Sequence, residues 1–166
     1  PVARAGEDKI AAVGEVLSFD AGASTDSDGS IVGYTWDFGD GGAASDGSVT
    51  YSYRRPGTYR VHLTVRDNST TRTGIGRDSI TVVVNDPPVA NAGLDQIVTS
   101  SEVRFDASGS MDPDGLVATY RWDFGDGNSG FGPRPTHVYG LPGTYRVRLV
   151  IQDNSGTIRS EASDEM

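Results

Sequence analysis

Two short loops gather carboxylates in a spacing that suits a divalent cation. In the first loop, Asp26-x-Asp28-Gly29 places two carboxylates on one tight turn, and Asp67 ends a predicted strand that we expect beside this loop. Calcium takes about six to eight oxygen ligands and tolerates irregular loops. Asp26, Asp28 and Asp67 are therefore candidate ligands of a calcium (Ca²⁺) site.

The second loop repeats this set later in the chain. Asp112-x-Asp114-Gly115 matches the first loop, and Asp153 follows at the same spacing as its counterpart in the first copy. A structural alternative stays open, because Asp side chains in such turns also accept hydrogen bonds from nearby backbone N–H groups. Asp112, Asp114 and Asp153 are accordingly either ligands of a second calcium site or turn residues.

Four further aspartates recur in pairs and invite comparison with catalytic carboxylates. Asp37 and Asp40 correspond to Asp123 and Asp126 in the second half of the chain. Paired carboxylates act as acid and base in glycoside hydrolysis, but a shared fold would also keep these residues in both copies. We expect them to cap turns. Because the chain has no cysteine and only two histidines, at non-equivalent positions, we expect no enzyme activity.

The element that must position these aspartates is a stretch that occurs twice, at 34–41 and at 120–127. Each copy reads Tyr-x-Trp-Asp-Phe-Gly-Asp-Gly. Aromatic residues two apart are typical of a strand with one buried face, and Asp-Gly is a strong turn signal. We expect Trp36 and Trp122 to lie in the cores of two similar domains.

Other segments alternate in the same way, and the 22 Gly and 8 Pro supply turns between them. Val16–Asp20 directs Leu17 and Phe19 inward, and residues 59–65 and 145–151 form the clearest strand pair. The prediction is an all-β protein of two tandem immunoglobulin-like sandwiches, residues 1–85 and 86–166. Residues 79–84 predict a last strand that has no counterpart in the second domain, which leaves an open edge there.

Charge and hydropathy exclude several classes of partner. The net charge is −9, with 23 acidic and 14 basic residues, which disfavours nucleic acid and anionic membrane surfaces. No run approaches the roughly 20 apolar residues needed to span a bilayer, so we expect no membrane insertion. The segment Asn85-Asp86-Pro87-Pro88 is stiff because proline restricts both itself and the preceding residue, and it predicts a semi-rigid linker.

Taken together, the motifs resemble the PKD (polycystic kidney disease) domain. Each half contains Asp-Ala-x-x-Ser-x-Asp-x-Asp-Gly, then the Trp-Asp-Phe-Gly-Asp-Gly strand, then Pro-Gly-Thr-Tyr-x-Val-x-Leu and Asp-Asn. The resemblance implies immunoglobulin-like modules that lie outside cells and accompany other domains of larger secreted or cell-surface proteins. It also implies that the modules themselves are not catalytic.

The resemblance extends the predicted ligand set. Some collagenase PKD domains bind calcium through a similar loop that is completed by residues of the preceding linker. Carried over, this adds Asn85 and Asp86 as candidate ligands of the second site. It also predicts that the second site is stronger than the first.

Three functions follow as hypotheses. The leading one is an extracellular spacer or adhesion module that calcium stiffens. A second is a substrate-binding accessory domain for collagen, chitin or another polymer, which needs exposed aromatics; the candidates are Tyr51, Tyr53 and Phe131, and we expect Phe131 to tuck under its own loop. A third is a filament subunit that self-associates by strand addition at its open edge.

Overall fold

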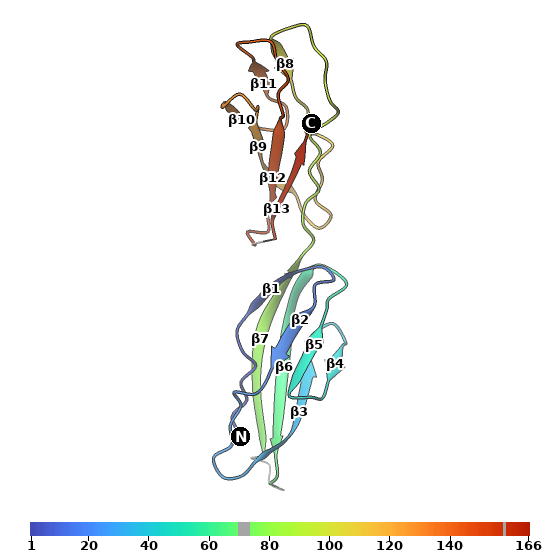
Figure 1. The fold of residues 1–166 in the computed structure, drawn as a ribbon. Helices are drawn as coiled ribbons and strands as arrows, with labels where there is room; N and C mark the ends of the chain where they lie inside the picture. Colours follow the sequence, from blue (N-terminus) through green and yellow to red (C-terminus); the bar gives the residue numbers. More distant parts are fainter. Residues whose placement is uncertain (70–73, 158) are drawn as a thin grey trace. The chain divides into compact units, whose positions relative to one another are not determined.

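The structure is a computed structural model that describes residues 1–69, 74–157 and 159–166. Every regular element in this part of the chain is a β-strand, which confirms the all-β prediction. The chain divides into two compact units, Pro1–Asn85 and Asp86–Met166 (Figure 1). Among the described residues, no helix is present that could cross a lipid bilayer.

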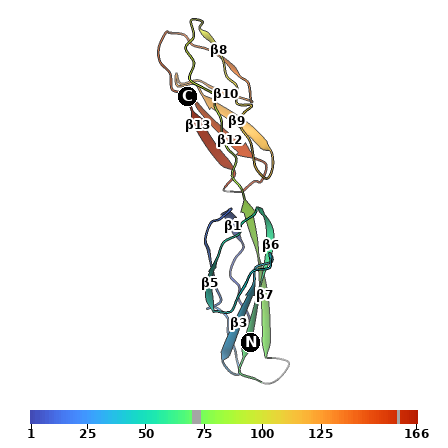
Figure 2. The ribbon, with the colours of Figure 1, turned by 90° about the vertical axis from the view of Figure 1, so that its right-hand side faces the viewer.

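The first unit consists of two sheets. The larger has the strand order β1-β7-β6-β3-β4, and the smaller pairs β2 with β5 on one face of it (Figures 1 and 2). β7 runs parallel to β1 and antiparallel to β6. The strands are β1 Lys9–Ala12, β2 Leu17–Asp20, β3 Ile31–Asp37, β4 Ala43–Ala44, β5 Ser48–Tyr51, β6 Gly57–Asp67 and β7 Ile75–Asn85.

The core of the first unit lies between these sheets and follows the predicted alternation. Trp36 on β3 is fully buried, and Phe19 on β2 packs against it with ring centroids 5.7 Å apart. Val61 and Leu63 on β6 are buried on the same face, while His62 between them is exposed. Alternation along each strand therefore puts the aromatic and aliphatic residues into one core.

The second unit repeats this arrangement, but several of its strands are shorter, and among the described residues β1 has no counterpart in its sheets. One sheet has the order β10-β9-β12-β13, and the other pairs β11 with β8. Trp122 on β9 is fully buried and packs against Phe105, with ring centroids 5.4 Å apart. The strands are β8 Glu102–Arg104, β9 Val117–Asp123, β10 Ser129–Phe131, β11 Thr136–Val138, β12 Arg148–Asp153 and β13 Glu161–Glu165.

The two units differ most in their last two strands. β6 has 11 residues, whereas its counterpart β12 has 6. β13 pairs with β12 and supplies the first half of the last strand, so the predicted gap affects only the second half. Beyond β13, Met166 and Val147 exchange two backbone hydrogen bonds of 3.0 Å. The strand thus reaches the point where the second half of β7 begins in the first unit.

Candidate metal centre

Each acidic loop is tied to the end of the strand that carries its third aspartate. Asn68, directly after β6, accepts the Ser30 N–H with its side chain at 3.2 Å and donates its own N–H to the Ser30 carbonyl at 3.0 Å. Asn154 forms the same pair of bonds with Leu116, at 3.0 and 3.1 Å. The Asp-Asn dipeptide at each strand end therefore holds its aspartate beside the loop.

Glycine at the end of each Asp-x-Asp-Gly motif permits this close approach. A Cβ atom built on Gly29 would overlap the side-chain oxygens of Asn68 and Asp26. At Gly115, a Cβ atom would overlap the corresponding oxygens of Asn154 and Asp112. A side chain at either glycine would have to displace these oxygens, so glycine leaves room for the loop to pack onto the strand end.

The first set of predicted ligands converges. The carboxylate oxygens of Asp26, Asp28 and Asp67 lie within 4.8 Å of one another. The Asp26 side chain is only 2% exposed, and within the described part of the chain neither of its oxygens accepts a hydrogen bond. The amino group of Pro1 lies 3.5 Å from Asp26 Oδ1 and 3.9 Å from Asp67 Oδ2. The centre therefore concentrates negative charge, and in this structure the amino group of Pro1 is the cation that lies beside it.

Hydrogen bonds favour the ionised form of Asp67 in this centre. Its Oδ1 accepts the Ser69 N–H at 2.8 Å. Hydrogen bonds from the side chain and backbone of Ser69 lower the pKa of Asp67, because they stabilise the charged carboxylate. A charged, oriented carboxylate is the form that a hard cation such as calcium binds.

The second set shares the buried carboxylate but not the full convergence: among the described residues, only Asp26, Asp28 and Asp67 form a group with oxygens within 4.8 Å of one another. Asp112 Oδ1 is buried and has no hydrogen-bond partner among the residues described. Burial raises the pKa of Asp112, and the charges of Asp114 and Asp153 raise it further. Asp153 is 6% exposed, and its Oδ1 accepts the Ser155 N–H at 2.8 Å. Like charges are therefore held close together on a partly desolvated loop.

The two linker residues lie in different places. Asp86 belongs to the second unit, and its N–H donates to Asp114 Oδ2 at 3.3 Å, so the structure brings Asp86 to the second set. Asn85 is buried at the end of β7 in the first unit, where its carbonyl accepts the Val13 N–H at 3.2 Å. The assignment of Asn85 as a ligand of the second site stays a prediction.

The other paired aspartates cap turns, as predicted. Asp37 accepts the Gly39 N–H at 3.0 Å, and Asp123 accepts the Gly125 N–H at 2.9 Å. Asp40 and Asp126 likewise each accept a backbone N–H two residues ahead, both at 3.0 Å. These carboxylates are thereby committed to holding the turns after β3 and β9.

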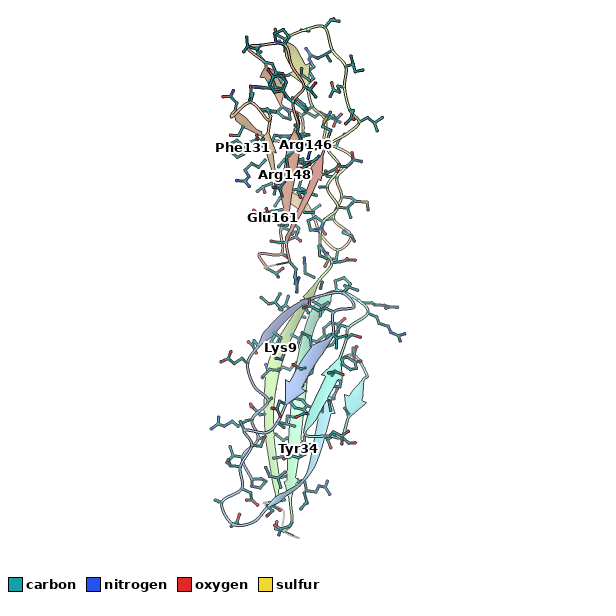
Figure 3. The ribbon with its side chains drawn as sticks, viewed as in Figure 1. Lys9, Tyr34, Phe131, Arg146, Arg148 and Glu161 are labelled. Atoms are coloured by element: carbon teal, nitrogen blue, oxygen red, sulfur yellow. The ribbon has the colours of Figure 1, made fainter. Side chains whose placement is uncertain are left out.

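The expectation that Phe131 tucks under its loop is wrong. Phe131 is 73% exposed, on β10 (Figure 3). Because Gly130 pairs with the buried Trp122, the next residue along the strand must point outward, opposite Arg121. Of the other two aromatic candidates, Tyr53 is buried, and Tyr51 stacks on a core phenylalanine with ring centroids 3.9 Å apart. Phe131 alone of the three offers an exposed ring.

Comparisons with known proteins agree on one family. A family model described as "PKD domain" matches residues 1–83 and 85–166. Collagenase ColA of Clostridium perfringens is 38% identical over 91 residues, which cover 54% of this chain and 8% of the collagenase. The pre-pro-metalloprotease PrtV of Vibrio cholerae is 33% identical over 141 residues, which cover 81% of this chain and 14% of the protease.

A solved domain from the same protease also matches. The PKD1 domain of PrtV from Vibrio cholerae is 31% identical and aligns with a TM-score of 0.42, over 48% of this chain and 91% of that domain. The present chain thus spans only a small part of the curated relatives it matches, 8% of one and 14% of the other.

Proposed function

Because the chain belongs to the PKD-domain family, we propose that it is a non-catalytic extracellular module of a larger secreted or surface protein, a semi-rigid spacer that calcium stiffens at its acidic loops. The observation that carries the proposal is the buried Asp26 carboxylate, whose oxygens accept no hydrogen bond from the described residues. Asp28 and Asp67 lie beside it, with carboxylate oxygens within 4.8 Å.

A bound cation would offset the energetic cost of burying the Asp26 carboxylate beside two other carboxylates. A buried carboxylate without hydrogen bonds is costly, and neighbouring carboxylates add repulsion. Calcium offsets both effects, and it accepts the irregular oxygen geometry of a loop more readily than magnesium does. In the first site the ligands would be Asp26, Asp28 and Asp67; in the second they would be Asn85, Asp86, Asp112, Asp114 and Asp153.

Calcium at these positions would join two parts of each unit. Asp26 and Asp28 belong to the loop between β2 and β3, whereas Asp67 ends β6. A shared ion would thus cross-link the loop to the strand end and restrict their relative motion. Support for a role as an accessory to other domains comes from the relatives, a collagenase and a pre-pro-metalloprotease, in which the matched segment is a small part.

Thermal unfolding of the whole chain in calcium and in chelator tests the proposal. At about 100 times its dissociation constant, calcium adds about 2.7 kcal/mol to the stability of a folded site. We expect calcium to raise the Tm of the wild type. Asp28→Ala or Asp114→Ala alone should reduce this gain, and the variant that carries both substitutions should lose it. Asp46→Ala, which removes an exposed aspartate elsewhere, should keep the full gain. A wild-type Tm that calcium leaves unchanged would refute the metal sites.

A second candidate function, binding of an extracellular polymer, is favoured by the exposed Phe131. A shallow hollow of about 360 Å³ lies beside this ring, and Arg121 and Arg148 contribute to its lining. An exposed aromatic ring next to hydrogen-bond donors suits a sugar or peptide chain. Co-sedimentation with insoluble collagen and chitin tests this: the wild type should be retained, Phe131→Ala released, and Leu116→Ala, at an exposed apolar residue elsewhere, retained. Failure of the wild type to bind either polymer would dismiss this function.

A further inference from the structure

The hollow beside Phe131 lies on the sheet face of the second unit that points away from the core (Figure 3). Arg121 on β9 lies opposite Phe131 on β10 and, on its other side, opposite Val150 on β12. Side chains directly opposite each other on antiparallel strands have Cβ atoms about 4.5–5.5 Å apart. The guanidinium of Arg121 is therefore flanked by one aromatic and one aliphatic side chain.

Arg121 forms no ion pair within the described part of the chain, since the ion pairs of the second unit join other residues. Asp123 is the one carboxylate among the described residues that line the hollow. It accepts the Gly125 N–H at 2.9 Å and lies opposite Arg148. Arg148 in turn donates to the Ser163 hydroxyl at 3.3 Å. The hollow thus presents a cation whose charge no neighbouring carboxylate offsets directly.

The first unit shows that the fold needs neither the arginine nor the aromatic ring. Thr35 occupies the position of Arg121, directly before the buried tryptophan. Ser45 occupies the position of Phe131, because in each unit the preceding residue pairs with that tryptophan. Both Thr35 and Ser45 are exposed. The same strand pairing therefore forms with two small hydroxyl residues, and packing alone does not account for Arg121 and Phe131.

We propose that this hollow binds a sugar acid, that is, a pyranose ring that carries a carboxylate. The apolar C–H face of the sugar would pack on the Phe131 ring, and its carboxylate would accept hydrogen bonds from the Arg121 guanidinium. A planar guanidinium matches a carboxylate with two parallel N–H donors. One sugar ring can reach both side chains, because they stand directly opposite each other. The inference rests on the second candidate function in placing its ligand at Phe131.

The charge of the whole chain limits the size of the anion. A net charge of −9 repels a long polyanion. At about 0.15 M salt, charges separated by more than about 8 Å are largely screened, whereas a direct contact between Arg121 and one carboxylate is much shorter. A short oligosaccharide with a few carboxylates therefore fits this site better than a densely charged polymer.

Titration of the whole chain with trigalacturonate at about 0.15 M salt, followed by calorimetry or NMR, tests the proposal. The matched probe is the methyl ester of trigalacturonate, which has the same rings without their charges. We expect the wild type to bind the acid at least about tenfold more tightly than the ester, because hydrogen bonds to an ionised group are the stronger ones.

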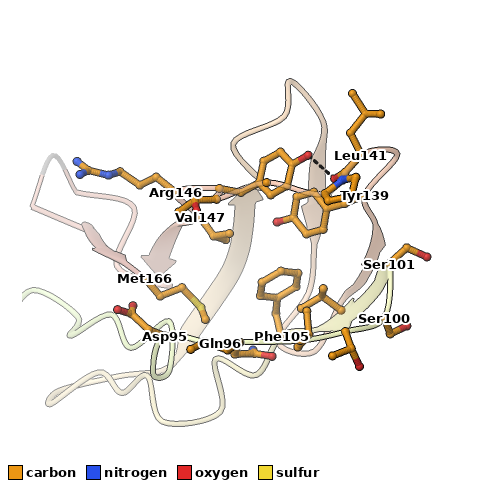
Figure 4. Close-up of a pocket in the computed structure, with 18 of the residues that line it drawn as sticks. Asp95, Gln96, Ser100, Ser101, Phe105, Tyr139, Leu141, Arg146, Val147 and Met166 are labelled. Carbon is orange, nitrogen blue, oxygen red and sulfur yellow. Dashed lines mark hydrogen bonds between the residues drawn. The ribbon is translucent and has the colours of Figure 1, made fainter.

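Four variants separate the parts of the site. Arg121→Thr should remove the preference for the acid, and Phe131→Ser should weaken both probes by about tenfold; each copies the residue of the first unit, so the Tm should hold. Arg146→Thr removes an arginine outside the hollow that lies 3.5 Å from Glu165. Leu141→Ala removes an exposed apolar side chain at a separate groove (Figure 4). Both control variants should bind the probes like the wild type.

Equal affinity for the acid and the ester, or no binding of either, would overturn the proposal. So would an equal loss in Arg146→Thr and Arg121→Thr, which indicates attraction by net charge alone. Triglutamate that binds as tightly as trigalacturonate would assign the hollow to acidic peptides instead. Retention on collagen or chitin is a separate readout. A protein that binds trigalacturonate without being retained keeps the sugar-acid site, whereas one that is retained without preferring the acid loses only that site.

Discussion

His137 Nε2 lies 2.8 Å from Asp126 Oδ2 in the second unit, at the position where Tyr51 donates its hydroxyl to Asp40 at 2.9 Å in the first. Each of these rings also stacks on the phenylalanine of the Trp-Asp-Phe motif, with centroids 4.2 and 3.9 Å apart. Two chemically different side chains therefore perform one structural task, which is to cover the core and hold the turn that follows the central strand.

The Asp126 pair predicts a loss of stability in acid. The hydrogen bond from His137 and those from Asn128 lower the pKa of Asp126 to about 2, below the value of about 3.9 for an unfolded chain. Because the folded pKa is depressed, this contribution is complete above about pH 4 and is lost as the pH falls through about 2. Between about pH 6 and about pH 2, the free energy of unfolding of Asp126→Asn, measured with denaturant, should fall less than that of the wild type. Equal slopes for the two proteins would contradict the assignment.

His137→Tyr should preserve the second unit. Tyrosine at this position reproduces the pair that the first unit already holds, with stacking and a hydroxyl donor to the turn carboxylate. His137→Ala removes both, and loss of the aromatic pair alone costs about 0.5–1.5 kcal/mol beyond the lost buried area. In thermal unfolding, the Tm of His137→Tyr should be close to that of the wild type, and the Tm of His137→Ala should be clearly lower. A tyrosine variant as unstable as the alanine variant would argue against equivalence.

Gly29→Ala should damage the first acidic centre. The new Cβ would overlap the side-chain oxygens of Asn68 and Asp26, and overpacking of this kind costs about 1–3 kcal/mol. We expect a lower Tm in chelator and a smaller gain with calcium. Gly140→Ala is the matched control, because a Cβ there has no heavy atom within 4 Å. If Gly29→Ala unfolds like Gly140→Ala, the loop has room to shift, and the close approach is not required.

The two tryptophans should report on two unfolding transitions. Trp36 and Trp122 are both fully buried, and truncation of such a residue to alanine costs about 3–5 kcal/mol. We expect the second unit to unfold first, because β12 and β13 have 6 and 5 residues, whereas β6 and β7 have 11 each. Calorimetry should show that Trp122→Ala removes the lower transition and that Trp36→Ala shifts the upper one, while Val32→Ala, at an exposed residue, changes neither. A single transition shifted equally by both tryptophan variants would contradict this.

Much of the fold could be predicted because its signals are local. The alternation around Trp36 and along residues 59–65 defines which face of each strand is buried, and the buried Trp36, Leu63 and Val65 confirm it. The Asp-Gly turns could also be predicted, because Asp37 and Asp40 accept hydrogen bonds from N–H groups only two residues ahead. Repetition of the same motifs in the second half indicated two similar units.

Other features depend on contacts between distant residues and had no local signal. Phe131 was expected to be covered, but the register between β10 and β9 turns it outward. The pairing of Asp8 with the backbone of Thr81 spans most of the first unit. The bonds between Asn68 and Ser30, which hold the acidic loop in place, likewise join residues 38 positions apart.

The sequence by itself determined the strand faces, the capped turns and the residue types of the two acidic sets, because each depends on neighbours within a few positions. Only the tertiary structure decided that the carboxylates of Asp26, Asp28 and Asp67 converge and that the register of β10 with β9 turns Phe131 outward. Both outcomes depend on strand pairing and packing between residues far apart in the chain. Spacing along a sequence cannot specify such distances.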